Sequence, residues 1–121
     1  MPTLKVISIG VHDMDAARAF YVDALGLEVD DDSMAPHFVE LKNDGPTLLL
    51  ALCTQPQRSD YPAGATVALD FSVADAAKEL ARLTELGADV VHGELQPSPV
   101  GPYFAVRDPS GNVLELIQFS R

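Results

Sequence analysis

The sequence predicts an α+β fold in which two βαβββ modules form a curved mixed β-sheet with a concave cavity and helices outside. Stretches that alternate apolar and polar residues, typical of strands, are interrupted twice by stretches with helical spacing. The order strand, helix, strand, strand, strand then occurs twice, which indicates an internal repeat. We expect a single domain over residues 1–121, made of repeats at about 1–53 and 65–121 that a loop at 54–64 joins.

In the first repeat, residues 4–11 alternate as a strand, and Asp13 is a favourable helix N-cap. Apolar positions from Met14 onward follow helical spacing, and Gly26 is expected to end the helix. An acidic turn is expected at 30–32, and the remaining strands are expected at 27–29, 37–41 and 47–52.

In the second repeat, Asp75 is the expected N-cap of a helix that runs to Leu86, and Gly87 ends it. The final hairpin turns at Pro109 and Gly111, two residue types that favour tight turns. The other strands are expected at 66–73 and 90–91 and on both sides of this turn, within 104–117.

Composition restricts the classes of partner. The net charge of −10 argues against nucleic acid and anionic membranes. The longest apolar run, 48–53, is too short to cross a membrane, and the N-terminus lacks the pattern of a signal peptide. The single cysteine, Cys53, fits a reducing compartment. We therefore expect a cytoplasmic protein that binds neither membranes nor nucleic acid.

Alternation along the strands predicts which side chains line the concave face. Most are small or apolar, with a few polar groups among them, which is the usual composition of a small-molecule pocket. The candidate ligand-binding residues are Ser8, His37, Val39, Leu49, Asp70, Ser72, Tyr103 and Glu115.

Asp70 and Glu115 are predicted to share this face, and three interpretations remain open for them. The two carboxylates are solvated without a specific role, or they bind a cation such as an amine or guanidine. In the third interpretation, burial and mutual repulsion raise one pKa, so that this carboxyl group acts as a general acid or base. Tyr103 is either a hydrogen-bond donor to a ligand or a core aromatic with a solvated hydroxyl.

Two segments resemble motifs of the vicinal oxygen chelate superfamily, namely Asp13, Phe20, Tyr21, Leu25 and Gly26 in the first repeat and Asp108-Pro-Ser-Gly-Asn with Glu115 in the second. This superfamily includes glyoxalase I, extradiol dioxygenases, bleomycin-resistance proteins and fosfomycin-resistance transferases. The resemblance covers nearly the whole chain. It implies paired βαβββ modules and a homodimer.

In the metal-using members, a divalent ion in the cavity takes ligands from the first and fourth strands of each module. The corresponding positions in this chain are Val6, Leu49, Ala68 and Glu115. Only Glu115 has a ligating side chain, whereas catalytic metal sites use about three protein ligands. We therefore expect no metal ion and no other cofactor. The three histidines show no metal-ligand spacing, and exposed positions are expected for His12 and His92.

The resemblance implies three alternatives for function. The first is a non-catalytic protein like those of the bleomycin-resistance branch, which confers antibiotic resistance by sequestering a small cationic or aromatic molecule. The second is a metal-dependent or metal-free lyase, isomerase or dioxygenase that uses Glu115, with unusual partners such as His37 or without metal. The third is an interaction module that has lost its ligand.

Overall fold

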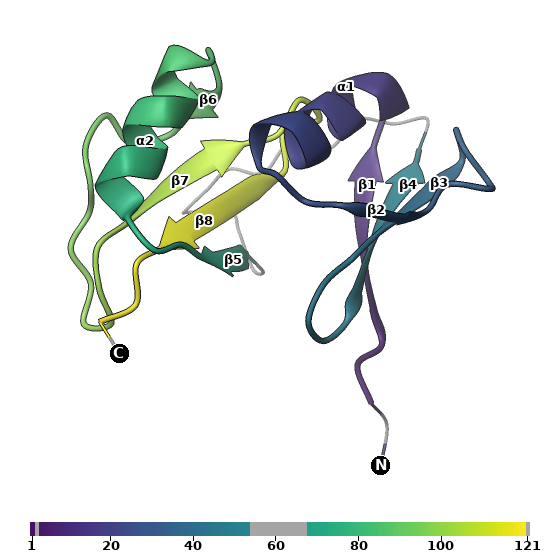
Figure 1. Cartoon of the computed structure of the whole chain (residues 1–121), viewed down its shortest axis with the longest axis horizontal. Coiled ribbons are helices and arrows are strands. Elements are labelled where there is room, and N and C mark those ends of the chain that lie inside the picture. Colours follow the sequence, from purple (N-terminus) through teal and green to yellow (C-terminus); the bar gives the residue numbers. More distant parts are fainter. Residues whose placement is uncertain (2, 54–67, 121) are drawn as a thin grey trace. The chain divides into compact units, whose positions relative to one another are not determined.

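The computed structural model describes residues 1, 3–53 and 68–120 (Figure 1). The chain divides into two compact units, Met1–Gln57 and Arg58–Arg121, and each unit contains one four-stranded sheet. The loop predicted at 54–64 lies outside the described residues, as do the first two residues of the strand predicted at 66–73. Each unit has the βαβββ order, so the predicted α+β fold is confirmed.

In the first unit the strand order is β1-β4-β3-β2, with β1 parallel to β4 and the other neighbours antiparallel. This order places the two strands that follow the helix furthest from β1. The elements are β1 (Val6–Val11), the helix α1 (Met14–Arg18) with a π-helical continuation η1 (Ala19–Ala24), β2 (Val29–Asp31), β3 (Phe38–Leu41) and β4 (Thr47–Leu52).

Asp13 begins the first helix as predicted, because its carboxylate accepts a hydrogen bond from the Ala16 N–H at 3.0 Å. Gly26 follows the helix with φ at 86°, a conformation that favours glycine. The apolar positions that predicted the helix form its buried side, which consists of Met14, Ala17, Phe20 and Tyr21.

Alternate residues of the first sheet lie on opposite faces. One face carries side chains that are at most 3% exposed, from Val39, Leu41, Leu48 and Leu50. The residues between them, including Phe38, Glu40 and Leu49, lie on the other face, which we call the open face of the first sheet.

The second unit repeats this topology with the strand order β5-β8-β7-β6 and a parallel pair β5–β8. Its helix lies against one face of the sheet and contacts β6 and β7 (Figure 1). The elements are β5 (Leu69–Ser72), α2 (Ala76–Glu85), β6 (Asp89–Val90), β7 (Tyr103–Arg107) and β8 (Val113–Ile117).

Two acidic side chains organise the ends of elements in this unit. The carboxylate of Asp75 accepts the Lys78 N–H at 3.1 Å at the start of α2. The buried carboxylate of Asp108 accepts the N–H groups of Ser110 and Asn112 at 2.9 and 2.8 Å. Asp108 therefore shapes the turn between β7 and β8, as expected for an Asp in a turn.

Several strand boundaries differ from the prediction, and β1, for example, begins at Val6 rather than at residue 4. Strand β2 spans Val29–Asp31 rather than the predicted 27–29. Asp30 and Asp31 therefore belong to a strand and not to the predicted turn. The cause is pairing with β3, in which Val29 is the partner of Leu41 and an irregularity precedes the next pair. Strand β3 begins one residue later than predicted, and β6 begins one residue earlier.

Candidate functional site

The second sheet brings Asp70 and Glu115 together. They are Cα partners in the parallel pair β5–β8, and directly paired residues point to the same side of a sheet. Desolvation, a hydrogen bond with Glu115 and the charge of Glu115 raise the pKa of Asp70 to about 6. This carboxyl pair can therefore hold or release a proton close to neutral pH.

Ser72 and Tyr103 lie on the same face as this pair, because both are Cα partners of Ile117, two residues beyond Glu115. We call this surface the Glu115 face. The four candidate residues of the second repeat are thus brought to one face, as the alternation predicted. Their contact with a ligand stays a prediction.

His92 is not the exposed residue that the sequence predicted. It is half-buried after β6, and its Nδ1 accepts the Ala105 N–H at 3.1 Å. Its ring lies edge-to-face with that of Tyr103, with centroids 5.8 Å apart. Because an accepting Nδ1 carries no proton, this bond requires the tautomer protonated on Nε2 when His92 is neutral. His92 therefore extends the edge of the sheet beside Tyr103.

In the first unit, two candidate residues lie where they were predicted and two do not. Ser8 and Leu49 are Cα partners on the open face. Val39 is fully buried and pairs with Leu50 on the opposite face, so its assignment to the cavity is wrong. His37 precedes β3 and alternates with Phe38, which takes the open-face position instead.

Hairpin length explains this error. Glu40 pairs with Leu49, nine residues further along, whereas Ala105 pairs with Glu115, ten residues further along. His37 and Val39 would share the face of Leu49 only if the first hairpin were one residue longer, so their assignment to the cavity displaces β3 by one residue. Such a displacement moves every side chain of a strand to the other face.

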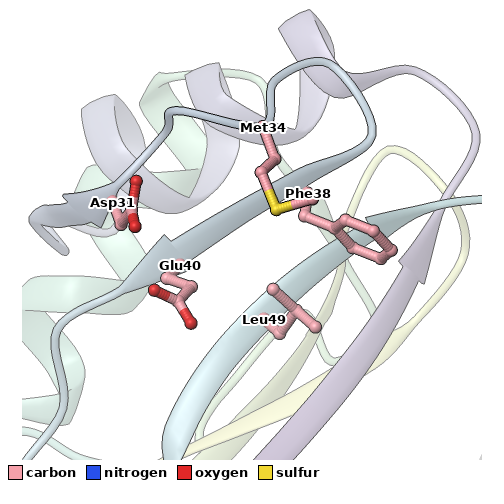
Figure 2. A pocket seen from close by; sticks show the side chains of 5 residues that line it. All are labelled: Asp31, Met34, Phe38, Glu40 and Leu49. Atoms are coloured by element: carbon pink, nitrogen blue, oxygen red, sulfur yellow. The ribbon is translucent and has the colours of Figure 1, made fainter.

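The open face of the first sheet contains a pocket of about 220 Å³ (Figure 2). Figure 2 shows the carboxylates of Asp31 and Glu40 on one side of the view and the three apolar side chains on the other. The pocket is lined by Asp31, Met34, Phe38, Glu40 and Leu49.

Of these five lining residues, only Leu49 is a candidate from the sequence. The sequence contains a signal for Phe38 and Glu40, because side chains of the strand run Phe38-Val39-Glu40-Leu41 alternate between the two faces of the sheet. Because a charged side chain is rarely buried, Glu40 is expected on the open face. Phe38 lies two residues before Glu40 in the same strand and is therefore expected on that face too. No comparable signal identifies Met34, which lies in the connection before β3.

The four positions that hold the ion in metal-using members of the resembled superfamily lie within the described residues, and only Glu115 among them has a ligating side chain. Among the described residues, no group of three or more His, Cys, Asp or Glu side chains could hold a metal ion. Val6 and Leu49 lie on the open face of the first sheet, and Ala68 precedes β5. These three side chains have no ligating atom, which leaves Glu115 alone.

Comparison with solved structures shows the same fold in proteins of different activity. TnmS3, an antibiotic binding protein from Streptomyces sp. CB03234, is 25% identical with a TM-score of 0.75, over 99% of this chain and 98% of that one. A lactoylglutathione lyase from Agrobacterium tumefaciens is 26% identical with a TM-score of 0.72, over 94% and 91% of the two chains. A glyoxalase/bleomycin resistance protein from Streptomyces sp. CB03234 is 26% identical with a TM-score of 0.69, over 94% and 98%.

Among curated proteins, no sequence matches this chain significantly. The family model described as the Glyoxalase/Bleomycin resistance protein/Dioxygenase superfamily matches residues 3–116. This match spans both βαβββ units, in agreement with the topology. The chain therefore belongs to the glyoxalase/bleomycin resistance protein/dioxygenase superfamily.

Proposed function

We propose that this protein binds and sequesters a small cationic or aromatic molecule without a metal ion. The observation that carries the proposal is that apolar side chains occupy three of the four positions that hold the metal ion in metal-using members of the superfamily. Val6, Leu49 and Ala68 offer only hydrocarbon surface there, which favours contact with an organic molecule. We further propose that the protein acts as a cytoplasmic homodimer.

The comparison with TnmS3 supports this proposal, because that neighbour is an antibiotic binding protein with the same fold over nearly the whole chain. No helix in the described part of the chain has the length and hydrophobicity needed to cross a membrane. The acidic net charge of −10 adds an attraction for cations.

The proposal is tested by two measurements on the purified, untagged protein. Metal content is determined after loading with Zn²⁺, Ni²⁺, Mn²⁺ and Fe²⁺ and desalting, and we expect no near-stoichiometric retention. A thermal-shift screen of cationic and aromatic antibiotics is then expected to identify ligands that raise the melting temperature of the metal-free protein. Stoichiometric retained metal, or a screen in which no compound stabilises the protein, would contradict the proposal.

The raised pKa of Asp70 favours a second candidate function, a metal-free lyase or isomerase. A carboxyl group with a pKa of about 6 beside Glu115 suits general acid–base chemistry near neutral pH. Conversion of lactoylglutathione by the metal-free protein, lost in Asp70→Asn and in Glu115→Gln, would support this candidate over sequestration. Absence of conversion at pH 5 to 8 would argue against it for this substrate.

A further inference from the structure

We infer that the pocket on the open face of the first sheet binds an organic cation of the aromatic amidine or amine class. In this arrangement the cationic group lies beside Asp31 and Glu40, and the flat body of the ligand contacts Phe38. The inference rests on the proposed function, which leaves open whether the ligand is cationic or aromatic, and adds the binding site and a ligand that is both.

The two carboxylates are placed to act on one cationic group. Asp31 and Glu40 are Cα partners in β2 and β3, so their side chains share one side of the sheet. The Ser33 N–H donates to Asp31 Oδ1 at 2.8 Å, and this bond lowers the pKa of Asp31. Asp31 is therefore ionised at neutral pH. An amidinium group has donors that match a pair of carboxylates.

Basic side chains of the same unit leave these carboxylates uncompensated. Arg18 pairs with Asp32 at 3.3 Å, and Lys42 pairs with Glu28 at 3.4 Å. No ion pair among the described residues involves Asp31 or Glu40. Residues 1–53 contain nine acidic and three basic side chains, so the unit carries a negative field that attracts cations.

The other side of the pocket suits an aromatic body. Phe38 is 40% exposed and Met34 is 62% exposed, so a bound ligand would remove their apolar surface from water. The face of a phenylalanine ring attracts cations, and a methionine thioether makes favourable contacts with aromatic rings. A cation attached to an aromatic ring uses both properties.

The size of the pocket limits the ligand. Its volume of about 220 Å³ lies below the roughly 300–1,000 Å³ that is typical of pockets for drug-sized molecules. A pocket of this volume suits a single substituted ring or one end of a larger ligand. Benzamidine is therefore a suitable probe, and benzamide is its neutral counterpart of nearly the same shape.

Binding of both compounds to the full-length protein is measured by isothermal titration calorimetry. We expect saturable binding of benzamidine, at least about tenfold tighter than that of benzamide, because hydrogen bonds to charged groups are the stronger class. Asp31→Asn and Glu40→Gln should each weaken benzamidine binding about three- to tenfold. Phe38→Leu keeps an apolar side chain without the ring and should also weaken binding.

Asp23→Asn is the matched control. It removes the same charge from an exposed position of η1 outside the pocket, and binding should change by less than about twofold. Equal affinities for benzamidine and benzamide, or equal effects of the pocket variants and of Asp23→Asn, would overturn the inference. Circular dichroism of each variant verifies that the fold is retained.

Methionine-methyl NMR locates the bound probe directly. The chain has three methionines, of which Met34 lines the pocket and Met14 is buried at the start of α1. Benzamidine should move the Met34 signal and leave that of Met14 in place. No shift at Met34 would overturn the assignment. The assignment would also be overturned if the wild-type protein is a dimer and Phe38→Asp is a monomer, because Phe38 and the pocket would then lie at the contact between two copies.

The outcomes also separate this inference from the proposed function. If benzamidine fails to bind while neutral aromatic antibiotics still stabilise the protein, the cation site is wrong and sequestration stands. If no antibiotic and no probe binds, both the cation site and the proposed function are wrong.

Discussion

At the scale of single residues, the two carboxylate pairs differ in the direction of their pKa shifts, although each lies on neighbouring strands, antiparallel in the first pair and parallel in the second. Asp31 with Glu40, and Asp70 with Glu115, are each direct partners on neighbouring strands. A backbone N–H from Ser33 lowers the pKa of Asp31, whereas desolvation and the neighbouring Glu115 raise that of Asp70. The first pair therefore suits a permanent cation, and the second suits a group that exchanges a proton.

The raised pKa of Asp70 predicts a specific pH dependence of stability. Its pKa rises from 3.8 to about 6 on folding, so the folded state binds the proton more tightly. The resulting stabilisation is complete below pH 4 and is lost as the pH rises through 6. Asp70→Asn should therefore melt at a higher temperature than the wild type at pH 7.5, with a smaller advantage at pH 4.5.

The measurement is thermal unfolding of both proteins across this pH range, with Asp23→Asn as the exposed control. A difference in melting temperature between Asp70→Asn and the wild type that stays constant with pH would show that Asp70 has an ordinary pKa in the folded protein.

At the scale of elements, the N-cap of α2 makes a quantitative prediction. The carboxylate of Asp75 accepts the Lys78 N–H, so Asp75→Ala leaves this donor without its side-chain partner. We expect the free energy of unfolding to fall by about 1 kcal/mol. Asp75→Asn keeps an accepting oxygen and should stay within a few tenths of 1 kcal/mol of the wild type. Urea denaturation measures both, and equal losses in the two variants would contradict a capping role.

The same scale shows how far the sequence predicts the fold. Helix caps at Asp13 and Asp75, and glycines after the helices, are local signals, and the structure confirms them. The face on which a strand side chain lies depends on pairing with a distant strand. One residue less in the first hairpin was enough to bury Val39 and expose Phe38. For this reason the sequence does not predict the pocket, whereas it does predict the shared face of Asp70 and Glu115 from alternation along their strands, and the structure adds that the two residues are direct partners.

At the scale of the whole molecule, charge distinguishes the proposed ligand from a neutral one. The net charge of −10 attracts a cation over a distance set by the Debye screening length of the solution. This distance falls from about 30 Å at 0.01 M salt to about 3 Å at 1 M. The attraction of charges outside the pocket should therefore vanish at high salt, while contacts with Asp31 and Glu40 persist in part.

We accordingly expect the affinity for benzamidine to fall about three- to tenfold between 0.01 M and 1 M sodium chloride. The affinity for benzamide should change by less than about twofold, because a neutral molecule gains nothing from the distant charges. Calorimetric titrations at four or five salt concentrations provide the test. A benzamidine affinity independent of salt would mean that the acidic composition serves solubility alone, and that the ligand is recognised by its apolar body.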